Sequence, residues 1–472
     1  MMSSDLKPEQ EIEVGQGSRT QLYLAVLSVN FLYICNGTFA TWTSPTMAKL
    51  KDQFTANEIA LVGSLYSLGA AFGPIIAAFT YDNLGRKVTL YIWGSCFIVS
   101  WIILASSINV YVLYVGRMIG GVGVGGSFST GTLFVAEVAD VKSRGSLSTL
   151  LIFSVSAGIL LEYCVGPWSS YHVLIIVSAI PAILFVATFF YFPESPYYLL
   201  LKERKADAIE SLRWYRGNIA PSAAETELSE IQKNVEESKA NKGGFRALGR
   251  RGAVFALMIG IYLLIVQQGV GQNAMLSYTQ TIFEMSNIEI PGSICAIISG
   301  TTVIIGSFFT PFIVNRFSMK KTFLVATYLV AIGMGLLGLF FYLKSSGHDV
   351  SKLSFLPLLA FVMCNLFSSW GPAPIPWAMT AELLPTQVKG ICTCICGVIS
   401  SLAGFLVIEI TGIMFDKVGL AAVFGGYFIF IVLLTTIGIF IIPDTSGMSL
   451  PEIHEFMETE KRPQRRRSYA QS

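Results

Sequence analysis

Residues 171–192 read YHVLIIVSAIPAILFVATFFYF, a stretch without Asp, Glu, Lys or Arg. A membrane-spanning helix needs about 20 apolar residues to cross about 30 Å of hydrocarbon, and this stretch meets that length. It ends at the polar sequence Pro193-Glu194-Ser195-Pro196. The fold therefore depends on how often such stretches recur.

Working outward from residues 171–192, we find twelve apolar segments. They are residues 21–44, 57–80, 88–108, 110–136, 147–168, 171–192, 253–283, 291–314, 321–343, 354–380, 391–415 and 419–442. Of the 472 residues, 53% are hydrophobic and 13% are charged, against about 25% charged in soluble domains. The mean hydropathy is +0.61. The sequence therefore predicts an all-α integral membrane protein with twelve transmembrane helices, and disfavours the alternative of buried helices in a large soluble protein.

Lysines and arginines mark one side of the membrane. They follow every even-numbered segment: Arg86, Lys87, Lys142, Arg144, Arg316, Lys320, Lys321, Lys389, Lys461, Arg462 and residues 465–467. By the positive-inside rule these exits and both termini are cytoplasmic. The loop after the first segment disagrees with this rule, because it contains Lys49 and Lys51. No cleavable signal peptide is evident, so we expect a multi-pass protein of the cell membrane.

The hydrophilic stretches divide the chain. We expect a cytoplasmic tail at residues 1–20, a six-helix half at 21–192, a cytoplasmic linker at 193–252, a second six-helix half at 253–442 and a cytoplasmic tail at 443–472. Within the linker, residues 202–214 and 223–240 are rich in helix formers with helical spacing of apolar residues. Short amphipathic helices are the prediction there, and a disordered linker is the alternative.

The two halves repeat the same marks in the same order. The sequence Asp82-Asn83-Leu84-Gly85-Arg86-Lys87 has its counterpart at residues 315–321, and Glu137…Arg144-Gly145 matches Glu382…Lys389-Gly390 with identical spacing. This pattern indicates an internal duplication. Carriers built from such repeats bind substrate near the bilayer midplane, between the halves.

The seventh segment carries amides: Gln267-Gln268-Gly269-Val270-Gly271-Gln272-Asn273. Amides that faced lipid would cost free energy, so they should face the bundle interior or water. Gln267 and Asn273 point about 120° apart on a regular helix. The glycines suggest a break that brings them together to bind a ligand; interhelical hydrogen bonding is the alternative.

The tenth segment is interrupted. Gly371, Pro372, Pro374 and Pro376 precede Trp377, and each proline removes a backbone donor. Such an interruption is tolerated only against protein or a water-filled cavity. An indole beside it can stack on a ligand and donate one hydrogen bond, although an interfacial tryptophan is the alternative.

Three charges lie inside spans: Arg117, Glu162 and Glu409. Intramembrane acids are candidates for coupling or substrate binding, and water-facing structural acids are the alternative. Cys392, Cys394 and Cys396 do not share one helical face and have no histidine near them, so we expect packing rather than metal binding. We see no nucleophile or phosphate-binding loop. We therefore predict no enzyme, no cofactor and no nucleic-acid partner.

The ordered motifs resemble the sugar porter family of the major facilitator superfamily. They are Gly116-Arg117, Pro193-Glu194-Ser195-Pro196, the amide motif, residues 371–377 and Pro443-Asp444-Thr445-Ser446-Gly447-Met448-Ser449-Leu450. The end of the first segment, residues 42–45, looks most like the insect facilitated trehalose transporter branch. The resemblance implies the major facilitator fold, with two six-helix halves and short cytoplasmic helices between them.

The resemblance also implies roles for residues. Those expected to bind sugar are Gln267, Gln268, Asn273, Tyr278 and Trp377, and those of a gate in helix 10 are Gly371, Pro372, Pro374 and Pro376. A cytoplasmic latch that holds the halves together in the outward-facing state would comprise Asp82, Arg86, Glu137, Arg144, Glu194, Arg316, Glu382 and Lys389.

The chain departs from the family pattern at several positions. Asn315, Ser318, Met319 and Lys389 replace expected latch residues, so the second-half latch should be weaker, since lysine lacks the bidentate fork of arginine. Ile152, Val303, Ser277, Ser400 and Ser401 stand where polar or aromatic site residues are usual. These departures leave two questions open: which sugar is bound, and whether the chain still transports it.

We expect a facilitative transporter of hexose or trehalose that works by alternating access and functions as a monomer. Proton-coupled symport and a non-transporting sugar sensor are the alternatives. The aspartate of proton-coupled relatives aligns with Phe39, and residues 21–45 contain no acid, which favours uniport. The short tail after Pro443 favours a transporter over a sensor.

Overall fold

The structure of the chain is a computed structural model that describes residues 19–50, 52–140, 143–240, 248–286, 288–385, 387–445, 448 and 450–459. Several features discussed above lie outside these residues: Lys51, Lys142, almost all of the N-terminal tail, the basic cluster at 461–467, and Ser446, Gly447 and Ser449 of the last motif. Throughout the described part, the regular structure is helical.

Twelve helices or helix pairs in the described chain are long and apolar enough to cross a membrane. In the first half they are α1 Thr20–Thr41 with α2 Thr43–Leu50, α3 Ala56–Asn83, α4 Arg86–Ser106, α5 Val110–Val138, α6 Arg144–Val165 and α7 Tyr171–Phe189. In the second half they are α12 Arg251–Gly269 with α13 Gln272–Ser286, α14 Gly292–Arg316, α15 Met319–Ser345, α16 Leu356–Trp370 with α17 Ile375–Leu383 (preceded by η1 Ser351–Leu353), α18 Lys389–Lys417 and α19 Gly419–Ile441. Each coincides with one predicted segment, so the predicted fold class is confirmed and the chain is a multi-pass membrane protein.

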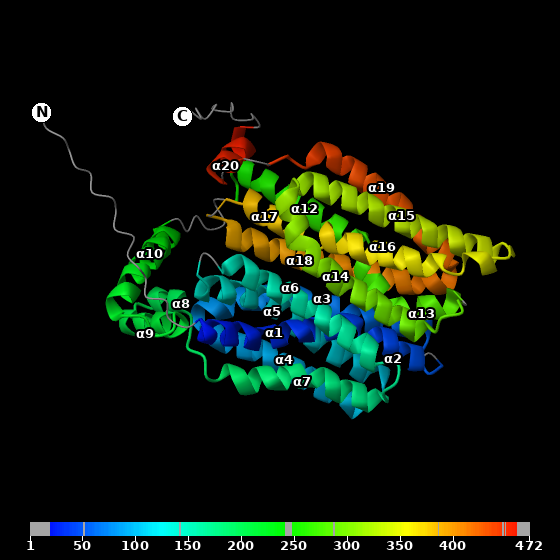
Figure 1. Cartoon of the computed structure of the whole chain (residues 1–472), viewed down its shortest axis with the longest axis horizontal. Coiled ribbons are helices and arrows are strands. Elements are labelled where there is room, and N and C mark those ends of the chain that lie inside the picture. Colours follow the sequence, from blue (N-terminus) through cyan, green and yellow to red (C-terminus); the bar gives the residue numbers. More distant parts are fainter. Residues whose placement is uncertain are drawn as a thin grey trace, which may run out of the picture.

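The two halves lie side by side with their helices running along the same direction (Figure 1). At one end, which we call the linker end, lie α8 Pro196–Leu201, α9 Lys205–Tyr215, α10 Pro221–Ala240 and α20 Leu450–Thr459. At the opposite end, which we call the far end, lie α2 and α13.

Small residues let α3 and α5 pack backbone to backbone. A Cβ on Gly121 would stand 2.1 Å from the Tyr66 carbonyl oxygen, and one on Gly125 would stand 2.0 Å from that of Ala70. The two glycines are four residues apart, as in the small-xxx-small pattern that brings membrane helices close. Side chains at these positions would push α3 away from α5.

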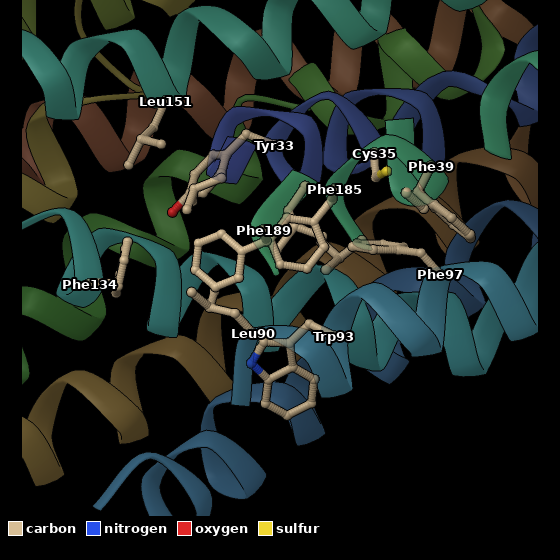
Figure 2. Packing of buried hydrophobic residues seen from close by; sticks show 14 of the residues in the cluster. Tyr33, Cys35, Phe39, Leu90, Trp93, Phe97, Phe134, Leu151, Phe185 and Phe189 are labelled. Carbon is tan, nitrogen blue, oxygen red and sulfur yellow. The ribbon is translucent and has the colours of Figure 1, made fainter. Parts of the chain in front are cut away.

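Aromatic side chains fill the interior of the first half (Figure 2). Trp93 and Phe97 from α4 pack with Phe185 and Phe189 from α7, and all four are fully buried. The Trp93 indole nitrogen donates to Thr130 Oγ1 of α5 at 3.0 Å, so its polar atom is satisfied in the core. These contacts join α4, α5 and α7 in one apolar core.

The linker helices form a small unit of their own. Leu199, Leu212 and Leu228 belong to an apolar cluster shared by α8, α9 and α10. Arg216 pairs with Glu227 at 2.7 Å and donates to the Val138 carbonyl at the end of α5 at 2.7 Å. The prediction of short helices is confirmed, and for the described part the disordered alternative is wrong.

Hydrogen bonds between the halves lie in the middle of the bundle and at the far end. Gln280 N donates to Ser44 Oγ at 3.1 Å, and Ser64 donates to Glu409 at 2.6 Å. In the middle, the hydroxyls of Ser156 and Ser307 are 2.9 Å apart. The structure is therefore closed at the far end.

Candidate functional site

The seventh span is broken where the sequence predicts a break. Helix α12 ends at Gly269 and α13 begins at Gln272. Between them, Gly271 has a φ of +74°, the left-handed conformation that glycine adopts without steric cost. A Cβ on Gly271 would also stand 2.7 Å from the Tyr427 ring, so both backbone and packing favour glycine.

The break brings Asn273 onto Gln268. Asn273 Nδ2 donates to Gln268 Oε1 at 2.8 Å, and Gln268 Nε2 bonds to Ser400 Oγ of α18 at 2.9 Å. The break thus brings Asn273 to Gln268 rather than to Gln267. Gln267 lies 100° away around α12 and faces the tenth span instead.

Gln267 joins the two helix breaks. Its Nε2 donates to the Ala373 carbonyl at 2.6 Å, and Ala373 lies between α16 and α17 among the prolines. The predicted interruption of the tenth span is therefore confirmed, at residues 371–374. Gln267 Oε1 is buried without a hydrogen-bond partner in the described part of the chain. Most buried acceptors are paired, so this atom is a candidate for ligand contact.

The amide cluster lies against the boundary between the halves. A Cβ on Gly404 of α18 would stand 3.1 Å from Gln268 Oε1 and 3.6 Å from Ser67 Oγ of α3. Residues from α12, α18 and α3 thus converge on one point. This is the place between the halves at which the sequence predicted a binding site.

The two aromatic candidates have different surroundings. Trp377 lies in the first turn of α17 and is 39% exposed. Tyr278 is buried, its hydroxyl donates to the Ile408 carbonyl at 3.3 Å, and a Cβ on Gly63 would stand 3.2 Å from that hydroxyl. The contacts of Tyr278 therefore belong to the crossing of α3 and α18 rather than to the amides.

Sequence reasoning missed Ser400 as a partner of the amides and Tyr163 as a bridge between the halves. Tyr163 of α6 donates to the Leu276 carbonyl at 2.8 Å and lies 2.9 Å from Thr279 Oγ1. The sequence signal for Tyr163 is a hydroxyl inside an apolar span, one residue after Glu162. Its partner, a backbone carbonyl of α13, leaves no mark in the sequence.

Arg117 is fully buried, and its hydrogen-bond partners are neutral, while the Glu162 carboxyl lies within electrostatic range. Its guanidinium donates to the carbonyls of Phe39 at 2.7 Å, Val62 at 3.0 Å and Gly63 at 3.4 Å. It also lies 4.7 Å from the centre of the Tyr66 ring. Among the described residues it forms no ion pair.

The intramembrane acids have hydroxyl partners. Glu162 is fully buried, its Oε1 is bonded to Ser178, and its Oε2 has no partner in the described chain. Glu409 is partly exposed and accepts from Ser64 across the boundary of the halves.

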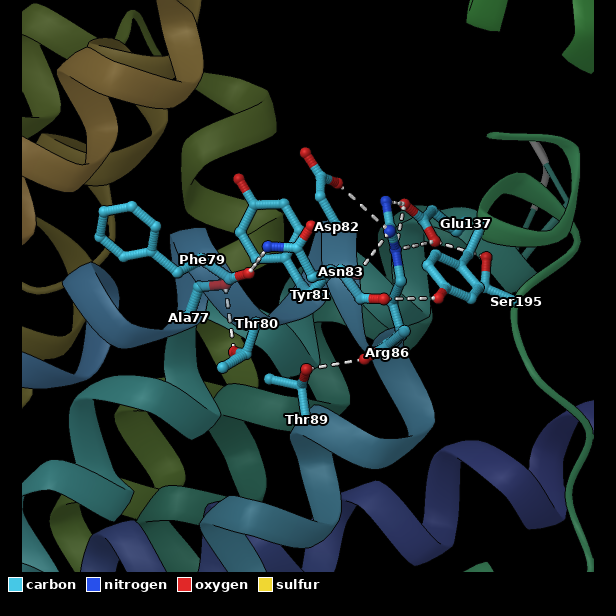
Figure 3. Close-up of polar contacts among 12 residues, drawn as sticks. Ala77, Phe79, Thr80, Tyr81, Asp82, Asn83, Arg86, Thr89, Glu137 and Ser195 are labelled. Atoms are coloured by element: carbon cyan, nitrogen blue, oxygen red, sulfur yellow. Dashed lines mark hydrogen bonds and ion pairs between the residues drawn. The ribbon is translucent and has the colours of Figure 1, made fainter. Parts of the chain in front are cut away.

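All first-half latch residues except Arg144 form one network at the linker end (Figure 3). Arg86 Nη2 pairs with Glu137 Oε1 at 2.8 Å, and Arg86 Nη1 pairs with Asp82 at 3.4 Å. Glu194 accepts from the backbone nitrogens of Arg86 and Lys87 at 3.1 Å each. Burial raises the pKa of the Glu194 carboxyl. These bonds lie within the first half, where they join α4 to α5 and to the start of the linker.

The remaining latch candidates are apart in this conformation. Arg144, Arg316 and Lys389 are exposed, and in the described residues neither these three nor Glu382 forms an ion pair. The side chain of Asn315 lies outside the description. One contact does repeat between the halves: Lys87 donates to the Phe190 carbonyl at 2.9 Å, and Lys320 donates to that of Ile439 at 2.8 Å.

Comparison with known proteins places this geometry in a family. Residues 23–457 match the model of the sugar (and other) transporter family. A facilitated trehalose transporter of Aedes aegypti is 30% identical over 442 residues, 92% of this chain and 55% of that protein. One from Apis mellifera ligustica is 30% identical over 445 residues, 92% of this chain and 88% of that protein. The chain thus spans about half the length of the first relative.

Solved structures share the fold. The inward-open xylose transporter XylE from E. coli has a TM-score of 0.78 at 22% identity, and the match covers 93% of this chain and all of that chain. The same protein as a proton:xylose symporter with bound 6-bromo-6-deoxy-D-glucose has a TM-score of 0.74 at 22% identity, over 93% of this chain and 99% of the other. At this identity the likeness shows the major facilitator fold.

Proposed function

Because the chain belongs to the sugar (and other) transporter family, we propose that it is a uniporter that carries a hexose or trehalose down its gradient by alternating access. The observation that carries the proposal is the meeting of two broken spans at the hydrogen bond from Gln267 to Ala373. Backbone freed from regular helix and unpaired amide groups suit a ligand that consists of hydroxyls. The relatives named as trehalose transporters support trehalose as the first sugar to test.

Alternating access is supported by the closed far end. If the linker end is cytoplasmic, as the positive-inside rule predicts, the closed far end is the extracellular end. Trp377, on the linker side of the second break, is then the aromatic surface that a sugar meets on release. The proposal places both termini in the cytoplasm and the protein in the cell membrane, acting as a monomer.

Uniport is supported by the surroundings of Arg117. Carbonyls and aromatic rings satisfy its guanidinium, and Phe39 supplies one of the carbonyls. Proton-coupled symport is the second candidate, and buried Glu162 is the observation that favours it.

The test is sugar uptake in cells that lack endogenous sugar carriers. Trehalose, glucose, fructose and xylose are offered at two external pH values, with surface expression measured in parallel. We expect uptake of at least one sugar that saturates with concentration and is independent of pH. Normal surface expression with no uptake of any sugar would contradict the proposal and favour a sensor.

A further inference from the structure

A ligand held between the two halves meets polar groups from both, but the amides at the two helix breaks all belong to the second half. We propose that Asn36 of α1 is the first-half residue that hydrogen-bonds the sugar. This inference rests on the proposed function, because it concerns a further contact of the same sugar. It makes Asn36 a residue that determines which hydroxyl pattern the carrier accepts.

The side chain of Asn36 has a partner at one end only. Asn36 is 2% exposed, and its Oδ1 lies 2.9 Å from the Ser127 hydroxyl of α5. Its Nδ2 is buried without a hydrogen-bond partner in the described chain. Because a serine hydroxyl can donate or accept, the amide can turn either end toward Ser127. In both orientations the opposite end of the amide is left for another group to pair.

Two hydrogen bonds between the halves fix the alignment of the first span with α13. Ser277 Oγ donates to the Ala40 carbonyl at 3.4 Å. About one turn farther along both segments, Gln280 N donates to Ser44 Oγ at 3.1 Å. The two contacts advance together toward the far end, so the first span runs parallel to α13.

The same alignment brings Asn36 level with the amide site. Residues four apart on a helix lie on one face, one turn above the other. Asn36 stands one turn before Ala40, on the face of α1 that meets the second half. Asn273 stands one turn before Ser277 in α13. Asn36 is therefore placed opposite Asn273, at the depth of the two helix breaks.

The other buried polar atoms without partners in the described first half lie at different depths. They belong to Gln21, Asn30, Trp42, Thr43, Thr46, Tyr91, Trp101 and Glu162. Gln21 and Tyr91 are near the linker end, and Asn30 is six residues, or about 9 Å, closer to that end than Asn36. The remaining five are in the last turns of their helices or in α2, toward the far end. Within this set, Asn36 alone has the depth of the amides.

A purely structural role for Asn36 has a different consequence from a ligand contact. Ser127 also donates to the Val124 carbonyl at 3.0 Å, so its hydroxyl keeps a partner when Asn36 is replaced. An apolar residue of similar size at position 36 would then remove a buried unpaired amide, a change that is neutral or stabilising for the fold. Stability and sugar binding should therefore separate in Asn36→Leu.

The experiment measures binding of radiolabelled trehalose and glucose to the purified full-length chain, together with its melting temperature without sugar. We expect Asn36→Leu to bind at least about tenfold more weakly than the wild type, a factor equal to about 1.4 kcal/mol, at an unchanged or higher melting temperature. Asn30→Leu is the matched control, since Asn30 is a buried amide of α1 with no partner for either polar atom in the described chain. It should bind sugar like the wild type. Asn36→Ala gives the same measurement if the leucine variant does not fold.

Monodeoxy derivatives of the two sugars identify the contact. At the ring position that Asn36 binds, the deoxy sugar should compete more weakly than its parent in the wild type and equally well in Asn36→Leu, because the hydroxyl has no partner left to lose. Wild-type affinity and an unchanged deoxy profile in Asn36→Leu would overturn the role of Asn36 and leave the proposed function standing. A wild-type chain that binds none of the sugars would overturn the proposed function as well.

Discussion

Each of Gln267, Asn273 and Trp377 offers a different group at the two helix breaks. Leaving a hydrogen-bonding group of a bound ligand unpaired costs about 1–3 kcal/mol. We therefore expect Gln267→Ala, Asn273→Ala and Trp377→Ala to reduce sugar uptake at normal surface expression. Gln267→Ala should have the largest effect, because it also strips the donor from the Ala373 carbonyl. The measurement is the initial rate of sugar uptake per protein molecule at the cell surface. Wild-type rates in all three variants would contradict the assignment of these residues to the sugar site.

Among the latch residues, Arg86 and Glu137 form a buried ion pair. Their side chains are 2% and 7% exposed, and removing one partner of a buried ion pair costs about 3–5 kcal/mol. Glu137→Gln should therefore lower the melting temperature of the purified protein and raise the accessibility of cysteines placed at the linker end. Arg144 is exposed and forms no ion pair in the described residues, so Arg144→Ala serves as the control. Equal melting temperatures for both variants would contradict the assigned roles.

At the level of single residues, the sequence locates polar side chains inside the spans but does not give their hydrogen-bond partners. Polarity inside an apolar span is enough to single out Gln267, Gln268 and Asn273. The pairing of Asn273 with Gln268 depends on the dihedral angles at Val270 and Gly271, which no helical projection contains. Partners such as the Ala373 carbonyl belong to the backbone, and therefore leave no trace in residue type.

Among the elements, α6 carries contacts between the halves both near the far end and in the middle of the bundle. Tyr163 bonds to α13, Ser156 bonds to α14, and a Cβ on Gly300 would stand 2.9 Å from the Tyr163 ring. Tyr163→Phe removes one hydroxyl and keeps the ring, so the helices should still pack. We expect this variant to open the far end more often, because the Leu276 carbonyl loses its cross-half donor.

The measurement is labelling of a cysteine introduced at Ser44, which lies in the far-end contact with Gln280. A membrane-impermeant thiol reagent added outside should react faster in the Tyr163→Phe background. Tyr111→Phe is the matched control, since Tyr111 is 71% exposed at the start of α5. Equal labelling rates in the two backgrounds would show that Tyr163 does not hold the far end closed.

Helix positions were predictable because hydrophobicity, proline and glycine act locally. Apolar length located the twelve spans, and clustered prolines located the second break. The position of Lys49, which disagrees with the positive-inside rule, also has a local explanation. Its ammonium donates to the carbonyls of Gly166 and Ser169, beyond the end of α6. Contacts between halves, such as α6 with α14, depend on the conformational state and were not predictable from the sequence.

Across the whole molecule, the two six-helix halves differ in their electrostatics. The first half has a buried ion pair and holds the linker helices through Arg216. In the second half, Lys389 and Glu382 do not pair in the described structure. The linker should therefore move with the first half during transport, and the second half should be the one that shifts against it.

The last prediction concerns energy coupling by the whole carrier. A guanidinium keeps its proton throughout the physiological range, so Arg117 needs a nearby acid to couple protons to sugar. In the described residues no acid forms an ion pair with Arg117, and its Nη1 donates to the carbonyl of Phe39. We therefore expect proteoliposomes to equilibrate sugar without accumulating it under an imposed proton gradient.

The residues that could defeat this prediction are Glu162 and Glu409, since buried acids can bind and release protons in pumps and transporters. Glu162 stands at the end of α6 that would open with the far end, so a proton held there in the closed state could leave to the outside. Accumulation against the sugar gradient that a protonophore abolishes would establish symport and overturn uniport. Glu162→Gln and Glu409→Gln would then identify the coupling acid, because only the variant that lacks it should retain downhill uptake and lose accumulation.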